Sequence, residues 1–172
     1  GFLSTDILVG IRGGTGQSRT QCGNRWTSVS ALPKLLFFVS EDWYFCSHRL
    51  PLAVAASKAG YSVSVLTRVN RHGEAIRGAG LRLIPFPLSR RGMNPIGEFL
   101  TLARLLIVYL REKPDLVHHV AMKPVLYGTF AARLAGVPCV VNALAGMGWL
   151  FTSESAMARR LNPVVRLAFR FL

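Results

Sequence analysis

The chain has 172 residues, of which 51% are hydrophobic, and its 21 Lys and Arg against 8 Asp and Glu give a formal net charge of +13. This size and composition exclude a disordered chain, and the longest apolar run, residues 99–110, is too short to cross a bilayer. The charge favours a phosphorylated ligand or an anionic membrane surface over nucleic acid, because no nucleic-acid-binding motif accompanies it.

Residues 1–33 differ from the rest of the chain, being rich in Gly, Ser, Thr, Arg and Gln with little periodicity. We expect a poorly ordered N-terminal extension there. The glycine-rich residues 13–16 resemble a phosphate loop only superficially, because the Gly-Lys-Ser/Thr ending is missing. A nucleotide-dependent enzyme that uses this stretch is a weaker alternative.

From residue 34 onward, short apolar runs alternate with helical patterns. The strands are expected at residues 35–40, 62–67, 81–86, 115–119 and 137–142, and the helices at 48–59, 73–77, 96–112, 123–135 and 154–172. This alternation predicts parallel strands joined by right-handed crossovers. The sequence therefore predicts an α/β domain over residues 34–172, a Rossmann-like parallel sheet flanked by helices.

Unusual polar side chains follow the predicted strands, beginning with residues 41–49, which we expect to form a loop. The carboxyl ends of parallel strands lie at one edge of the sheet, where ligands bind. No Gly-x-Gly-x-x-Gly follows the first strand, which argues against a dinucleotide cofactor. The candidate site residues at this edge are Asp42, Trp43, His48, Arg49, Arg91, His118, Lys123, Asn142 and Gly146.

His48 and His118 are the candidate general bases, because imidazole titrates near neutral pH. Helix capping or packing is the alternative role for His48. Successive strand residues face opposite sides, so at most one of His118 and His119 faces the crevice. The other is expected to point into the fold and to be satisfied by a hydrogen bond.

The remaining candidates each have a structural alternative. Asp42 would bind substrate or stabilise the dipole of a helix, and Trp43 would stack on a sugar or lipid. Arg49, Arg91 and Lys123 are candidate phosphate ligands, with a solvated surface as the alternative for each.

The end of the chain carries two further features. Gly146 offers backbone freedom for close approach to a ligand, although a simple loop is equally consistent. The basic helix expected over residues 154–172 would lie on an anionic membrane or pack against another part of the protein.

Several stretches form a recognisable set: residues 39–43, 47–53, 60–61, 72–73, 87–95, 114–124 and 141–148. Together they resemble the N-terminal half of a family 4 glycosyltransferase, of the bacterial group that builds capsular, exopolysaccharide and O-antigen repeat units. The resemblance implies a GT-B architecture, in which this half receives the acceptor. It also implies a C-terminal domain that holds the donor through a Glu-x7-Glu motif. The motif is absent here, so the donor domain is expected to be missing or to belong to a partner subunit.

The implied reaction transfers a sugar from a nucleotide sugar, which is expected to be UDP-linked. It retains the anomeric configuration and needs no metal or cofactor. The implied acceptor is a polyprenyl-diphosphate-linked saccharide. The protein would be cytoplasmic and peripheral on the inner membrane, and three widely spaced cysteines fit a reducing compartment. This half alone is expected to be inactive. The alternative is a non-catalytic α/β binding domain that pairs with a separate donor-binding subunit.

Overall fold

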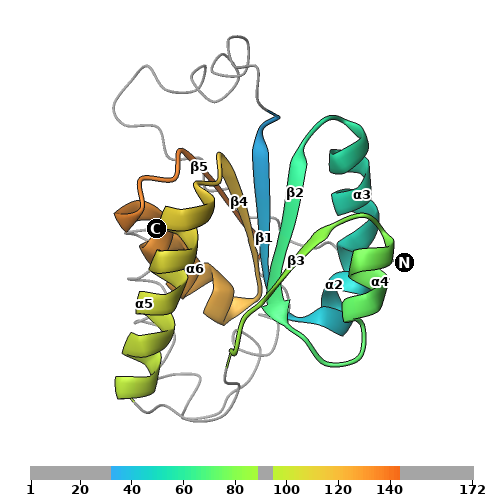
Figure 1. The fold of residues 1–172 in the computed structure, drawn as a ribbon. Coiled ribbons are helices and arrows are strands. Elements are labelled where there is room, and N and C mark those ends of the chain that lie inside the picture. Colours follow the sequence, from blue (N-terminus) through green and yellow to red (C-terminus); the bar gives the residue numbers. More distant parts are fainter. Residues whose placement is uncertain (1–31, 89–94, 144–172) are drawn as a thin grey trace, which may run out of the picture.

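The structure is a computed structural model that describes residues 32–88 and 95–143 (Figure 1). The predicted extension, except for residues 32 and 33, lies outside these residues. So do Arg91, Gly146 and the predicted helix at 154–172.

The described chain forms one parallel sheet flanked by helices, as the sequence predicts. The strands are β1 (Lys34–Glu41), β2 (Ser62–Arg68), β3 (Arg82–Pro85), β4 (Leu116–Val120) and β5 (Cys139–Ala143). The helices are α2 (Asp42–His48), α3 (Leu50–Lys58), α4 (Gly73–Gly78), α5 (Pro95–Glu112) and α6 (Met122–Leu134). The strand order is β3-β2-β1-β4-β5, and every neighbouring pair is parallel. The predicted Rossmann-like α/β fold is thus confirmed.

The prediction of a loop at residues 41–49 was wrong, because residues 42–48 form α2. Phe45 is fully buried, and its ring meets that of Phe37 edge-on at 5.7 Å. Asp42 in the first turn favours the helix dipole, and a proline near the start of α3 begins the second helix. Only Arg49 separates α2 from α3, so tertiary burial has turned the expected loop into a helix.

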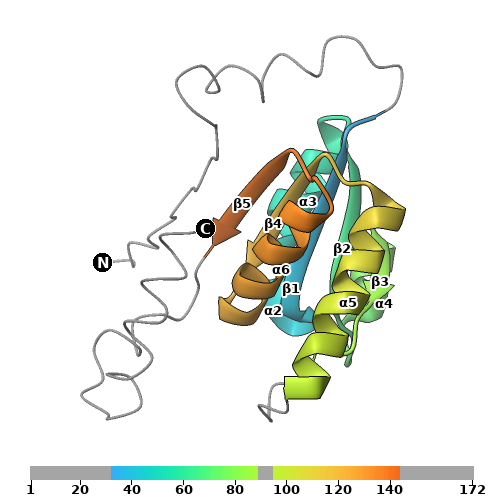
Figure 2. The ribbon, with the colours of Figure 1, turned by 90° about the vertical axis from the view of Figure 1, so that its left-hand side faces the viewer.

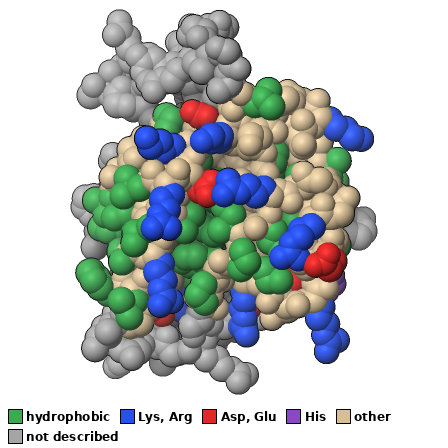
Figure 3. Space-filling view, viewed as in Figure 1, with side chains coloured by type: hydrophobic (Ala, Val, Ile, Leu, Met, Phe, Trp, Pro, Cys, Tyr) green, Lys and Arg blue, Asp and Glu red, His purple; other side chains and the backbone are tan. Residues whose placement is uncertain are grey.

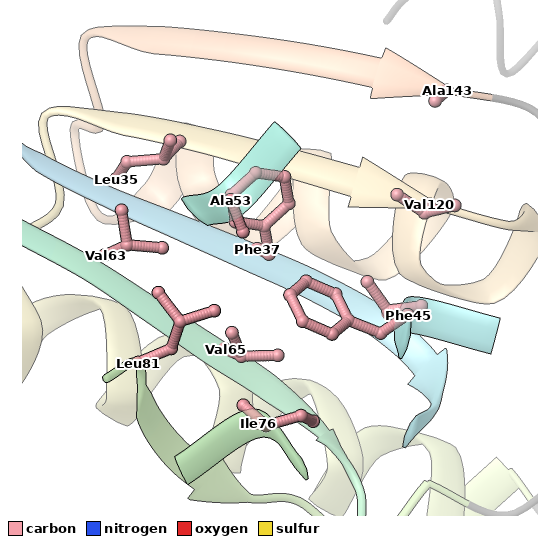
Figure 4. Close-up of a cluster of buried hydrophobic side chains, with 11 residues drawn as sticks. Leu35, Phe37, Phe45, Ala53, Val63, Val65, Ile76, Leu81, Val120 and Ala143 are labelled. Carbon is pink, nitrogen blue, oxygen red and sulfur yellow. The ribbon is translucent and has the colours of Figure 1, made fainter. Parts of the chain in front are cut away.

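The two faces of the sheet carry separate cores, beneath the helices that Figure 2 shows on either side of the strands. α2, α3 and α4 cover one face, where the odd-numbered residues of β1, such as Phe37 and Val39, meet Phe45 and Ile76 (Figure 4). On the other face, Phe38 packs among buried residues that include Leu105 and Tyr109 of α5 and Ala131 and Ala132 of α6. The alternation of β1 therefore supplies both cores from one strand.

The strand order reverses between β1 and β4. The chain leaves β1 into α2 on one face and leaves β4 into α6 on the other, so the two helices begin at the carboxyl edge on opposite faces of the sheet. Such a switch point is where open α/β sheets bind ligands. The fold therefore places the candidate site at the ends of β1 and β4.

Candidate functional site

A single residue, Ala121, connects β4 to α6. Its φ of 82° and ψ of 164° lie in a region that is essentially reserved for glycine. Its N–H donates to the carbonyl of Ala143 at 3.1 Å, which ties the turn to the end of β5. A backbone held in such a conformation costs about 1–3 kcal/mol and is typical of functional sites.

His118 lies on the face of the sheet that carries α2 and α3, and the charge of Arg49, between these two helices, acts on it. The His118 ring stacks on Phe37 with centroids 5.1 Å apart. Burial, and then the nearby positive charge of Arg49, lowers the pKa of His118 to about 4. The imidazole is therefore neutral at physiological pH.

The side chains of His118 and Arg49 each have one nitrogen without a hydrogen-bond partner among the described residues. Within the described residues, His118 Nε2 and Arg49 Nε are buried and have no hydrogen-bond partner. A buried polar atom without a partner costs about 1–3 kcal/mol, so native structures rarely leave one. Each of these two nitrogens can form a hydrogen bond to a ligand oxygen, such as that of a phosphate or a hydroxyl group.

His119 faces the opposite side and is fully satisfied inside the fold. Its Nδ1 donates to Asn142 Oδ1 at 2.8 Å, so Nε2 accepts from the Tyr109 hydroxyl at 2.9 Å. Thr129 donates to the same Asn142 oxygen at 3.2 Å. Burial lowers the pKa of His119 to about 4, against the opposing effect of the Asn142 hydrogen bond. The expectation that one of the two histidines is satisfied within the fold is confirmed.

This network gives Asn142 a structural contact, although the sequence suggested it as a substrate ligand. Tyr109 and Thr129 were not singled out from the sequence. Tyr109 lies on the buried side of α5, one turn from Leu105. A tyrosine at a core position of an amphipathic helix needs a hydrogen-bond partner for its hydroxyl. This requirement is the sequence feature that could have pointed to a buried polar contact of Tyr109.

Asp42 is fully buried and anchors a loop on its own side of the sheet. Its carboxylate accepts the N–H groups of Trp43 at 2.8 Å, Asn70 at 2.6 Å and His72 at 2.9 Å. Burial raises the pKa of Asp42, but the three backbone hydrogen bonds outweigh it, so the net pKa is lowered. Glu41 beside it accepts from the Asn70 amide at 2.7 Å. The contacts of Asp42 therefore match the structural alternative more closely than the substrate role.

Trp43 and His48 lie on the exposed surface of α2. The Trp43 side chain is 43% exposed, and the His48 ring stacks on Tyr44 with centroids 4.3 Å apart. His48 Nδ1 lies 3.3 Å from the Tyr44 carbonyl oxygen. Among the described residues, no hydrogen bond or ring contact links His48 to His118.

Lys123, in the first turn of α6, forms an ion pair with Glu98 of α5 at 2.9 Å. Burial raises the pKa of Glu98, but hydrogen bonds from Lys123 and Tyr127, with the charge of Lys123, lower it overall. Burial and Glu98 together raise the pKa of Tyr127 to about 12. No sequence pattern singles out Glu98 or Tyr127, because each has its partner on the other helix.

Three further observations bear on the site's chemistry. In residues 32–88 and 95–143, no three His, Cys, Asp or Glu side chains gather as metal ligands. No helix in those ranges is long and apolar enough to cross a membrane. Cys46 is a free thiol.

Two curated relatives share parts of the sequence. The UDP-Gal:alpha-D-GlcNAc-diphosphoundecaprenol alpha-1,3-galactosyltransferase of Escherichia coli is 35% identical over 71 residues, which are 41% of this chain and 18% of that protein. The N,N'-diacetylbacillosaminyl-diphospho-undecaprenol alpha-1,3-N-acetylgalactosaminyltransferase of Campylobacter jejuni subsp. jejuni is 24% identical over 127 residues, which are 72% of this chain and 34% of that protein. The alignments thus span about a third or less of the length of these relatives.

Solved structures share the fold at low sequence identity. MurG of Acinetobacter baumannii has a TM-score of 0.52 at 16% identity, covering 63% of this chain and 34% of that one. The UDP-GlcNAc 2-epimerase of Neisseria meningitidis has a TM-score of 0.52 at 14% identity, covering 76% and 38%. These similarities support the α/β fold alone.

A family model described as "Glycosyl transferase 4-like" matches residues 34–171, which is nearly the whole region that the sequence assigned to the domain. The match includes all five strands of the sheet and both Arg49 and His118. The chain therefore belongs to the glycosyl transferase 4-like family.

Proposed function

We propose that this chain is the acceptor-binding half of a retaining GT-B glycosyltransferase of surface-polysaccharide synthesis. The enzyme would move a sugar from a UDP-linked donor to a polyprenyl-diphosphate-linked saccharide at the inner membrane. The family match over residues 34–171 carries the proposal. The names of both relatives support it, because each describes transfer to a sugar on diphosphoundecaprenol.

In this proposal, Arg49 and His118 hold the acceptor at the switch point. The Arg49 guanidinium suits a diphosphate oxygen, because charge-assisted hydrogen bonds to phosphate are strong and directional. His118, with a pKa of about 4, stays neutral and binds a proton only weakly. It therefore suits a hydrogen bond to an acceptor hydroxyl better than general-base catalysis. His48 is the other candidate base, and Trp43, Arg91, Lys123 and Gly146 are proposed to line the same cleft.

We assign the donor to a second domain, which follows this half in the same polypeptide or belongs to a partner subunit. The short coverage of the relatives supports this assignment, since the alignments reach 18% and 34% of their lengths. This half alone is then expected to bind the lipid-linked acceptor without transferring a sugar.

The test combines this chain with its donor-binding domain, joined or as a separate subunit. The protein is incubated with radiolabelled UDP-galactose, UDP-glucose or their N-acetylated forms, and with bacterial membrane lipids. Label that enters the diphosphate-linked lipid supports the proposal. Acceptor binding with no transfer from any donor would favour the non-catalytic binding domain, and absence of both would reject the proposal.

A further inference from the structure

An apolar surface remains exposed on the outer side of α5 and α6. Its large side chains are Phe99, Leu100, Ile107, Leu110, Phe130 and Leu134, each about half or more exposed, with Phe99 at 70%. α5 and α6 lie side by side on one face of the sheet (Figure 2). We call this surface the α5–α6 face.

The helical geometry places the four apolar residues of α5 on one stripe. At about 100° per residue, Phe99, Leu100, Ile107 and Leu110 fall within an arc of about 100°. The buried Leu105 and Tyr109 lie on the opposite side of the helix. α5 therefore has two apolar sides, one for the core and one that no described element covers.

Basic residues border this stripe. Arg104 and Arg111 are exposed and fall just beyond the apolar arc on one side. Figure 3 shows hydrophobic side chains gathered on the left-hand part of the molecule, where α5 and α6 lie, with Lys and Arg among them. An apolar stripe beside a basic edge is the pattern of a helix that lies in a membrane interface.

The acidic residues of the two helices are already engaged. Glu98 pairs with Lys123 at 2.9 Å, and Glu112 pairs with Arg82 at 2.6 Å. α5 and α6 contain no other Asp or Glu. The α5–α6 face therefore combines exposed apolar area with the positive charges of Arg104 and Arg111, which pair with no acidic side chain among the described residues. This combination complements an anionic lipid surface better than a neutral protein surface.

We propose that the α5–α6 face docks on an anionic phospholipid bilayer. α5 begins at the carboxyl edge of the sheet, so Phe99 and Leu100 lie at the end of the helix that is nearest to that edge. The docked protein would then meet a lipid-linked acceptor at the surface where that acceptor is anchored. This role of the surface rests on the proposed function, whereas the binding to lipid is testable without it.

The test is co-sedimentation of the chain with vesicles of phosphatidylcholine alone or mixed with phosphatidylglycerol. One variant carries Phe99→Ser, Ile107→Ser and Leu110→Ser, and a second carries Arg104→Gln and Arg111→Gln. The matched controls are Leu52→Ser, which changes a 47% exposed leucine on α3, and Lys58→Gln, which removes an exposed charge from the same helix. Equal melting temperatures show that each variant is folded.

We expect the wild type and both controls to bind the vesicles that contain phosphatidylglycerol. The apolar variant should bind both compositions at least about tenfold more weakly. The arginine variant should lose about tenfold to thirtyfold on the anionic vesicles only, from about 1 kcal/mol per basic residue.

Two outcomes would overturn the docking proposal. One is a wild type that does not bind anionic vesicles, including the case in which it instead forms a dimer that the apolar variant abolishes. The other is a set of variants that bind like the controls.

Transfer to an acceptor with a short, water-soluble isoprenoid chain separates the docking proposal from the proposed function. If the apolar and arginine variants keep this transfer, their acceptor site is intact. If neither the wild type nor any variant transfers sugar, but vesicle binding changes as expected above, only the proposed function fails.

Discussion

Ala121 and His118 each have an energetically unfavourable feature near the switch point. Ala121 holds a conformation that suits glycine, and His118 keeps a buried nitrogen without a partner among the described residues. Neither feature improves folding; Ala121 directly follows the last residue of β4, and His118 lies in the middle of that strand. We interpret them as the cost of shaping a ligand site.

The strain at Ala121 predicts that Ala121→Gly stabilises the fold. Glycine relieves about 1–3 kcal/mol of backbone strain, and its greater freedom in the unfolded chain offsets up to about 1 kcal/mol. The free energy of unfolding in urea should rise by about 1 kcal/mol. Lys113→Gly is the control, because its φ of 48° lies in the milder left-handed region and should give a smaller gain. A loss of stability in Ala121→Gly would contradict the strain.

The buried histidines predict a pH dependence of stability. His118 and His119 have pKa values of about 4 in the folded chain, against about 6.5 when unfolded. Between these values the unfolded chain binds more protons, so stability is complete above pH about 6.5 and falls as the pH approaches 4. Each histidine contributes up to about 1.4 kcal/mol per pH unit. Urea titrations of His118→Gln should show a shallower slope, and an unchanged slope would contradict the lowered pKa.

The helices and strands are held together by contacts between residues that are far apart in the sequence, and local sequence patterns do not reveal such contacts. The periodicity predicted all five strands and the flanking helices, because buried strands and amphipathic helices leave local patterns. It missed α2, whose formation depends on Phe45 packing against Phe37 of a different element. It also missed the partners of Asp42, which lie 28 and 30 residues further along the chain.

α6 approaches β4 closely because residue 128 is glycine. A Cβ at Gly128 would lie 2.5 Å from His119 Nε2, whereas one at Gly78 of α4 would meet nothing within 4 Å. Gly128→Ala should lower the free energy of unfolding by about 1–3 kcal/mol through overpacking, despite the better helix propensity of alanine. Gly78→Ala should be neutral or stabilising. Equal effects of the two substitutions in thermal unfolding would show that the contact is unimportant.

Asp42 joins α2 to the loop that follows β2. Asp42→Asn removes the buried charge that three N–H groups share, so we expect a loss of about 2–3 kcal/mol and faster amide exchange at Asn70 and His72. Asp115→Asn is the control, because Asp115 accepts one N–H, from Lys34, at the exposed edge. A similar loss in both variants would argue against the anchoring role of Asp42.

At the scale of the whole molecule, the sequence placed most candidate residues at the carboxyl edge but could not assign their partners. Strand alternation predicted that one of two adjacent histidines turns inward, and His119 does so. Spacing could not show that Asn142 bonds to that histidine, or that Arg49 approaches His118. Those facts depend on how β1, β4 and β5 lie side by side.

The most direct measurement is the kinetics of sugar transfer by the protein with its donor domain. Arg49→Gln and His118→Gln should each raise the KM for the lipid-linked acceptor about tenfold or more and leave the KM for the nucleotide sugar unchanged. Lys58→Gln, which removes a charge at the far end of α3, should match the wild type. A changed KM for the donor, or unchanged kinetics in both site variants, would contradict an acceptor site at the ends of β1 and β4.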